Sequence, residues 1–353
     1  MTDRLFYVET QYQFLQAMTI LVDWRDSGEL DLGGYVFFID GTADKIIYSK
    51  RYLLEKDLNI SILDVKVYPF YLSAALSLLN TYRFRRFRGC NFYMFNNRSP
   101  VVSRLCAMFG ARGDVVQIEE GLSLYRTPKI HKPFRAVLLL LKKMLVSALT
   151  FSYYKDHVGH SDYSDTVLLR YPSLAGSNKF LSLKQIIKLP SLENLSFISS
   201  TLNSVYGLNQ LWLPKSKAGY VVFFGQPLGE LGLMDSQIEL ESVRAVANVV
   251  QSLGLNFLIK THPGENEGKY SSLGCELLES DAPAELMFSN ALNVEYVVSF
   301  YSTAALNVSE MLDIPAYFMF ECCGLNVDFP SLDGMTVLVS LNYETLRSEF
   351  LSN

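Results

Sequence analysis

Residues 219–226 read GYVVFFGQ, a short apolar run that ends in a glycine and a polar residue, and this arrangement decides the fold. Short apolar runs recur along the second half of the chain. Further apolar runs stand at 255–259, 294–299, 315–320 and 335–340, with helical patterns at about 236–252, 283–290 and 302–312. Buried strands that alternate with helices predict a parallel sheet covered on both faces. The second half is therefore expected to form a Rossmann-like domain.

The first half shows the same alternation. Apolar runs stand at 4–8, 35–39, 60–66, 91–95, 114–118 and 166–170, with helical patterns at 10–23, from Gly41 to Leu54, between the third and fourth runs, and at 99–109 and 135–150. Residues 122–215 are less regular, and LPKSKAG at 213–219 interrupts the pattern. We expect two Rossmann-like α/β domains, 1–215 and 216–353, that face each other across a cleft.

Length and composition agree with two globular domains. The chain has 353 residues, of which 49% are hydrophobic and 19% charged. A net charge of -5 disfavours a general nucleic-acid binder, which is usually strongly basic. Five cysteines without metal-type spacing predict free thiols in a reducing compartment. The N-terminus lacks a signal-peptide pattern, and no apolar run reaches the ~20 residues of a membrane span, so we expect a cytoplasmic protein.

A histidine-proline pair follows the apolar run at 255–259. Lys260, His262 and Pro263 stand just beyond this predicted strand, where open parallel sheets bind their ligands. His262 could donate a hydrogen bond to a phosphate oxygen or protonate a leaving group, because imidazole titrates near neutral pH. The alternative is a histidine in a plain turn that the proline ends.

A serine-rich segment follows the next strand. Ser299 ends the run at 294–299, and Ser302 and Thr303 stand where a helix begins. Backbone amides at a helix N-terminus, with hydroxyl groups beside them, can bind an anion. The alternative is ordinary helix capping, for which serine and threonine are favoured.

Two other segments of the second half are candidate contacts to a nucleotide. Gly225 and Gln226 follow the run at 219–224, and a glycine there allows a ligand to approach the backbone closely. The segment is not a GxGxxG fingerprint, so a nicotinamide enzyme is disfavoured. Glu285 begins a helix, where it could hold ribose hydroxyls or simply favour the helix dipole.

An acidic motif ends a strand of the first half. Glu119, Glu120 and Gly121 follow the run at 114–118. Neighbouring side chains on an extended chain point to opposite faces, so only one carboxylate can readily face the cleft. That carboxylate could act as general base on an acceptor hydroxyl. An acidic turn after a strand is also common without any catalytic role.

Together, EEG at 119–121, HP at 262–263 and SFYST at 299–303 resemble the motifs of bacterial sialyltransferases, in the same order. The similarity is to glycosyltransferase family 52 and the related bacterial polysialyltransferases, which have a GT-B fold. YVETQYQFLQA at 7–17 and GQP at 225–227 also look like segments of that group. The resemblance covers about residues 5 to 320, and the order and placement of its short motifs carry it.

The resemblance implies a role for each matching residue. Glu119 would deprotonate the acceptor hydroxyl, and His262 would bind the phosphate of CMP and could protonate it as it leaves. Ser302 and Thr303 would hold the same phosphate, at positions where the family often has two serines. Glu285 would contact the ribose.

The resemblance also implies the reaction. Glu120 and Gly121 would support the acidic loop, and the enzyme would move sialic acid from CMP-sialic acid to a glycan acceptor such as a surface polysaccharide or lipooligosaccharide. It would invert the anomeric centre without a metal or other cofactor, and the sequence shows no DxD-type metal motif at a predicted strand end. A CMP-Kdo or CDP-glycerol transferase of the same fold and a non-catalytic glycan-binding protein remain alternatives.

Two basic segments raise the question of membrane contact. LNTYRFRRFRG at 79–89 interleaves arginines with aromatic residues, and the apolar helix at 135–150 carries Arg135, Lys142 and Lys143. Such segments suit an anionic membrane surface and predict peripheral contact with the inner membrane. The alternative is that Phe84 and Phe87 pack into the first domain while the arginines are solvated or hold an acidic acceptor.

Overall fold

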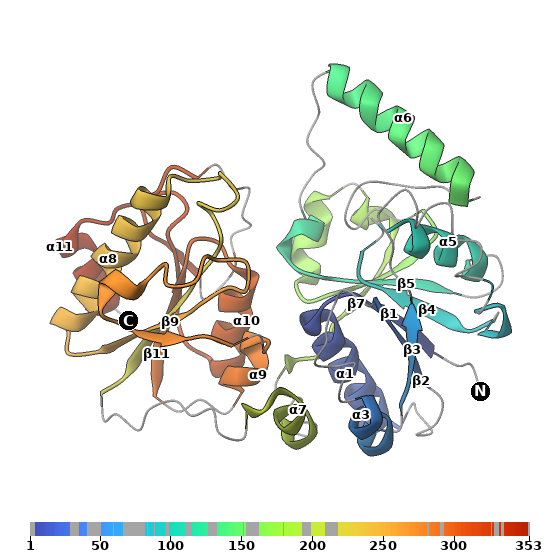
Figure 1. Cartoon of the computed structure of the whole chain (residues 1–353), viewed down its shortest axis with the longest axis horizontal. Coiled ribbons are helices and arrows are strands. Elements are labelled where there is room, and N and C mark those ends of the chain that lie inside the picture. The colour runs from blue at the N-terminus through green and yellow to red at the C-terminus, as the bar shows by residue number, and fades with distance from the viewer. Residues whose placement is uncertain are drawn as a thin grey trace. The chain divides into compact units, whose positions relative to one another are not determined.

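A computed structural model describes residues 4–28, 35–40, 51–58, 60–65, 82, 84–87, 89–96, 99–110, 114–125, 133–150, 152, 162–178, 180–192, 199–208, 218–280, 282–289, 293–325, 327, 332 and 335–351. The chain divides into two compact units, Met1–Tyr206 and Gly207–Asn353 (Figure 1). The interruption at 213–219 therefore falls near the start of the second unit. Each unit contains its own parallel sheet.

The first unit is built on a seven-stranded sheet in the order β3-β2-β1-β4-β5-β6-β7, with every pair parallel. Its strands are β1 (Arg4–Val8), β2 (Tyr35–Asp40), β3 (Ile60–Val65), β4 (Asn91–Met94), β5 (Val115–Ile118), β6 (Thr166–Leu169) and β7 (Gln185–Lys188). Its helices are α1 (Gln11–Asp26), α3 (Arg51–Leu58), α5 (Pro100–Phe109), α6 (Pro133–Thr150) and α7 (Ser199–Tyr206). The chain leaves β1 in one direction along the sheet and returns to β4 on its other side. The switch point, where open sheets bind ligands, thus lies between β1 and β4.

The six strands predicted for the first half are confirmed. The additional strand β7 lies at the edge of the sheet with mostly exposed side chains, so it lacks the apolar pattern that predicts a buried strand. The helix predicted from Gly41 falls largely outside the described residues, and so does the one predicted between the third and fourth strands.

The second unit has a six-stranded parallel sheet in the order β10-β9-β8-β11-β12-β13. Its strands are β8 (Tyr220–Phe224), β9 (Asn256–Lys260), β10 (Glu276–Leu278), β11 (Val294–Ser299), β12 (Ala316–Phe318) and β13 (Met335–Val337). Its helices are α8 (Ser236–Ser252), α9 (Ala284–Phe288), α10 (Thr303–Leu312) and α11 (Tyr343–Leu351). All five strands and three helices predicted here are confirmed, while β10 and α11 are additional.

Helices cover both faces of the second sheet. The pair α8 and α11 packs on one face and the pair α9 and α10 on the other (Figure 1). The core beneath α8 contains Val221, Phe223 and Ile259, which are fully buried. The switch point of this sheet lies between β8 and β11, so the residues that follow these two strands occupy the expected ligand edge.

Two expectations about the whole chain can be compared with the described residues. All five cysteines carry free thiols. Among the residues that the structure describes, no helix is both long and apolar enough to cross a bilayer.

Candidate functional site

Lys260 ends β9 with its side chain turned inward. It is only 5% exposed, and its Nζ donates to the carbonyl oxygens of Thr261, at 2.8 Å, and Ser280, at 2.7 Å. The ammonium group therefore joins the end of β9 to the segment that follows β10. These two hydrogen bonds fix the position at which the next loop leaves the sheet.

His262 is exposed in that loop, and two hydrogen bonds set its orientation. Its backbone N–H donates to Oε2 of Glu265 at 2.7 Å, and its ring Nδ1 accepts the N–H of Gly264 at 3.0 Å. Because Nδ1 acts as acceptor, the proton of the neutral ring lies on Nε2. Partial burial lowers the pKa of His262, with Lys260 and Lys269 adding to this effect and Glu265 opposing it. The ring is thus a neutral Nε2–H donor at pH 7, and Pro263, also exposed, follows it.

Behind the histidine, one ammonium group binds three carboxylates. Nζ of Lys269 lies 2.7 Å from Glu239, 3.0 Å from Glu265 and 3.1 Å from Glu230. The hydroxyl of Tyr270 donates a hydrogen bond to Oε1 of Glu265 at 2.5 Å. Burial alone would lower the pKa of Lys269, but the carboxylates raise it above its ordinary value. Burial raises the pKa of Glu239.

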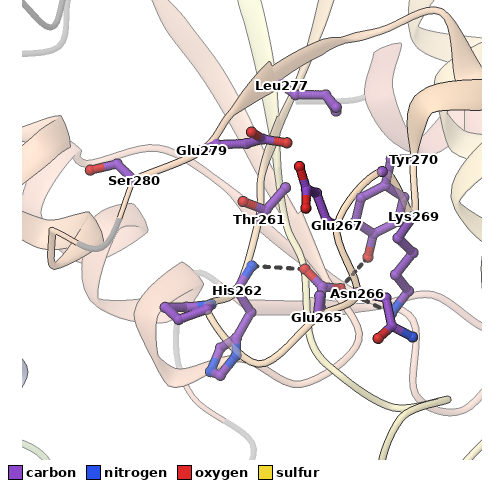
Figure 2. A pocket seen from close by; sticks show the side chains of 12 residues that line it. Thr261, His262, Glu265, Asn266, Glu267, Lys269, Tyr270, Leu277, Glu279 and Ser280 are labelled. Atoms are coloured by element: carbon purple, nitrogen blue, oxygen red, sulfur yellow. Dashed lines mark hydrogen bonds and ion pairs between the residues drawn. The ribbon is translucent and has the colours of Figure 1, made fainter.

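A pocket of about 380 Å³ lies beside this cluster (Figure 2). Three of its lining residues are the acids Glu265, Glu267 and Glu279. In Figure 2 the imidazole of His262 points away from Glu267 and Glu279. Lys269 also lines the pocket and neutralises Glu265, which leaves Glu267 and Glu279 to repel a phosphate, so an anion bound to the ring would lie on the side away from these two carboxylates.

The segment that follows β8 contacts the histidine loop. A side chain at Gly225 would overlap the carboxylate of Glu265, so the glycine leaves room for this protein group. A Cβ at Gly264 would lie 3.2 Å from Nδ1 of His262 and 3.5 Å from Cγ of Pro227. The loops after β8 and β9 are therefore closely packed together.

Gln226 connects the same segment to the end of β11. Its Oε1 accepts the N–H of Tyr301 at 2.8 Å and lies 3.1 Å from Oγ of Ser299. Ser299 is fully buried; its hydroxyl lies 3.0 Å from the carbonyl oxygen of Phe224 and accepts the N–H of Ser302 at 3.2 Å. Both polar side chains thus hold the turn that leads into α10.

The N-terminus of α10 is available to an external acceptor. Ser302 is the N-cap and Thr303 the first helical residue, and both are half-buried. In the described structure the Ser302 hydroxyl makes no capping hydrogen bond to the helix. The first-turn amides and two hydroxyls together form a set of donors suited to an anion.

Glu285 lies in the interior of the second unit. It is 2% exposed and accepts a hydrogen bond from Nδ2 of Asn307 at 2.8 Å. Because Glu285 belongs to α9 and Asn307 to α10, this bond fixes one helix to the other.

In the first unit, the two acids at the end of β5 have different surroundings. Glu119 is fully buried, and its Oε2 accepts the hydroxyl of Tyr125 and, at 2.6 Å, the N–H of Arg170. Burial, and then the charge of Glu119, raise the pKa of Tyr125. The turn between the acids and Tyr125 contains Gly121, whose φ of 147° favours glycine.

Glu120 belongs to a polar group at the switch point of the first sheet. Its Oε1 accepts a hydrogen bond from Nε2 of Gln13 at 2.5 Å. Oε1 of Gln13 accepts the N–H of Glu9 at 2.6 Å, and Oε2 of Glu9 accepts Nδ2 of Asn96 at 2.5 Å. The ends of β1, β4 and β5 are therefore joined by a short chain of carboxylates and amides.

These motifs occur in a chain that matches a known family over most of its length. The model of the alpha-2,8-polysialyltransferase family (POLYST) matches residues 52–320. The chain belongs to this family. No curated protein sequence matches it significantly.

Solved structures of low identity share the fold. UDP-GlcNAc 2-epimerase from Methanocaldococcus jannaschii is similar with a TM-score of 0.60 and 11% identity, covering 100% of this chain and 92% of its own. Spinosyn rhamnosyltransferase SpnG, complexed with thymidine diphosphate, is similar with a TM-score of 0.53 and 11% identity, and the match covers 100% of this chain and 92% of its own. The wall teichoic acid polymerase TagF is similar with a TM-score of 0.51 and 12% identity, and the match covers 99% of this chain and 78% of its own.

These comparisons confirm a GT-B type fold built from two Rossmann-like domains and identify a glycosyltransferase. The family supports sialyltransferase-type transfer, from a sugar donor to a glycan acceptor.

Sequence reasoning missed several residues that shape the loops of this candidate site. Glu265 and Lys269 brace the histidine loop, and their i,i+4 spacing after the HP motif was the available signal. Tyr125 and Gln13, which bind the two acids of the first unit, carry no local signal, because each meets its partner only in the folded chain.

Proposed function

We propose that this protein is an inverting sialyltransferase that moves sialic acid from CMP-sialic acid to a glycan acceptor without a bound metal. The observation that carries the donor assignment is the connection of three loops at one sheet edge. The segment 225–227 packs against the HP loop and, through Gln226, hydrogen-bonds the turn before α10. Donors from both motifs thus belong to one braced edge of the second unit.

The donors of this edge suit the single phosphate of CMP. Nε2–H of His262, the first-turn amides of α10 and the hydroxyls of Ser302 and Thr303 would stabilise the charge that develops on the phosphate as the sugar leaves. Fixed donors are effective here because they need no reorganisation during the reaction. A monophosphate leaving group held in this way requires no divalent ion, and hence we propose a metal-independent reaction.

Three residues behind the donor site would act by positioning. Lys260, Ser299 and Gln226 set the loops from which the donors project. Glu285, which the resemblance assigns to the ribose, is buried and bound to Asn307, so it would contact the ribose of CMP only by exchanging this hydrogen bond.

For the base we retain Glu119, as the resemblance implies. The Tyr125 hydroxyl donates to Oε2 just as an acceptor hydroxyl would, and it therefore marks the position from which a proton can be transferred. The acceptor oxygen would displace this hydroxyl, give its proton to Glu119 and bond to the anomeric carbon. The bond from that carbon to the CMP oxygen breaks on the opposite face, which inverts the centre.

Two measurements test the proposal. CMP should raise the melting temperature of the protein more than CDP or UDP, and CMP-sialic acid with a panel of galactosides and sialosides should give sialylated products by mass spectrometry. Stabilisation by CDP alone, with no sialylated product, would instead indicate a CDP-glycerol transferase. Product from CMP-Kdo and none from CMP-sialic acid would change the donor sugar but leave the site unchanged.

A further inference from the structure

Helix α6 carries an apolar face on its outer side. It packs against α5 through its C-terminal end, where Val146 and Thr150 are fully buried, and stands out from the rest of its unit (Figure 1). Five large apolar side chains are each more than half exposed: Leu138 at 51%, Leu140 at 56%, Leu141 at 57%, Met144 at 62% and Leu145 at 51%.

These five residues share one face of the helix. The spacings of Leu138, Leu141 and Leu145 and of Leu140 and Met144 are three or four residues, which brings side chains together on a helix. An ordinary surface helix turns its apolar stripe toward the core. Here the outward face of the described helix is the apolar one, and an exposed apolar patch of this kind marks an interaction surface.

The charges of α6 indicate what covers it. The helix contains Arg135, Lys142 and Lys143 and no acidic residue, although the whole chain has a net charge of -5. Both lysines are half-buried and lie toward the side that packs on the unit rather than among the exposed leucines. A helix with an apolar face on one side and basic groups on the other is typical of one lying in the interface of an anionic membrane.

The other basic segment does not share this arrangement. Phe84 is 3% exposed and belongs to the core of the first unit, and Phe87 packs against the same core. The exposed Arg85 and Arg86 lie over the rings of Tyr82 and Phe87. Phe84 and Phe87 therefore pack within the first unit, as the alternative to membrane contact predicts.

We propose that α6 docks this enzyme on an anionic membrane, with its exposed leucines and methionine in the acyl boundary and its lysines at the level of the lipid phosphates. Long lysine side chains can extend along the helix to reach that level. The apolar face is thereby removed from water, and the lysine side chains lie near the lipid phosphates.

Vesicle flotation of the full chain tests this proposal. Vesicles of phosphatidylglycerol and phosphatidylcholine should bind the protein at low salt, whereas phosphatidylcholine alone should not. The variant Leu141→Gln/Met144→Gln/Leu145→Gln should lower the partition coefficient at least ~10-fold. Lys142→Gln/Lys143→Gln should lower it by about 5-fold per lysine.

A matched control carries the same changes on the second unit. Ile238, Val339 and Leu351 are 56%, 71% and 65% exposed, and their replacement by glutamine should leave vesicle binding unchanged. Circular dichroism and melting temperature establish that each variant is folded.

Three results would overturn the proposal. They are absence of binding to anionic vesicles, equal loss of binding in the control, and conversion of a wild-type dimer to a monomer by the α6 triple substitution in light scattering. The last result would assign the apolar face to a second copy of the chain.

Discussion

The carboxyl edges of the two sheets place their polar residues differently. In the second unit, exposed or half-exposed groups, His262, Ser302 and Thr303, stand in front of buried ones that brace them. In the first unit, the acid assigned to catalysis, Glu119, is the buried one, while Glu120 is only half-buried. A position at the end of a strand therefore does not determine whether a residue contacts ligand or supports the loop.

Mutations should have different consequences at the two edges. At the donor edge, binding and bracing reside in separate residues, so affinity and stability should respond separately. At the acidic edge, one carboxylate both hydrogen-bonds the end of β6 through Arg170 and would accept the proton. Substitution of this carboxylate should therefore change activity and stability together.

The largest effect is expected at Glu119. Glu119→Gln should lower turnover by ~10²–10⁴-fold, the range for loss of a general base, and leave the affinity for CMP unchanged. Tyr125→Phe removes the hydroxyl partner but keeps the carboxylate, and is expected to lower the melting temperature with turnover largely retained. Initial rates, calorimetry and thermal melts measure the three quantities.

Glu120→Gln is the matched control for that experiment, because it removes the charge of the neighbouring acid. If Glu120→Gln abolishes turnover while Glu119→Gln only lowers the melting temperature, the base is Glu120 and the two acids exchange roles.

A second large effect is expected from the brace behind the histidine. Lys269→Met removes the shared counter-charge of Glu239, Glu265 and Glu230 and should cost ~3–5 kcal/mol of the free energy of unfolding. Acid protonates the carboxylates left without a partner, so the deficit should shrink between pH 8 and pH 5. Denaturant unfolding at both pH values measures it.

The control for Lys269 is an exposed ion pair in the same unit. The side chains of Arg244 and Glu241 are 36% and 58% exposed. Arg244→Met breaks the contact between them and should change the free energy of unfolding by less than ~1 kcal/mol. Equal effects of the two variants would show that the cluster does not brace the loop.

At the donor edge, His262→Ala should weaken CMP binding about 10- to 100-fold, the range for a hydrogen bond to a charged group. Because burial lowers the pKa of His262, the ring is neutral from pH 7 to pH 8 and its contribution should be constant there. A contribution that falls steeply across this interval in calorimetry would mean that the cation is the binding form.

The α10 hydroxyls should have a smaller effect than the histidine. Ser302→Ala/Thr303→Ala removes two neutral donors but keeps the helix amides, so a loss of about 10-fold in CMP affinity is expected. Gln237→Ala, at the N-terminus of α8 that Asp235 caps, is the control and should bind CMP normally. Unchanged affinity in the double variant would remove the hydroxyls from the phosphate site.

The smallest expected effect is that of a chelator. Excess EDTA should leave the initial rate unchanged, since fixed donors of the second unit are proposed to stabilise the leaving phosphate. Strict dependence on magnesium or manganese would contradict the proposed mechanism and favour a nucleoside-diphosphate donor.

The sequence by itself determined the alternation of strands and helices and the order of the three motifs along the chain. This was possible because apolar periodicity and short motifs are local properties: eleven predicted strands stand where the structure has them. It also indicated that only one acid of Glu119 and Glu120 can face outward, since neighbours on an extended chain alternate.

Only the tertiary structure decided which side chains reach the surface. Glu119 is buried because Tyr125 and Arg170 meet it, and the latter stands 51 residues away in sequence. The space beside Gly225 is filled by Glu265, a residue of a different loop. Exposure depends on such partners, and the segments that supply them come together only when the sheets form.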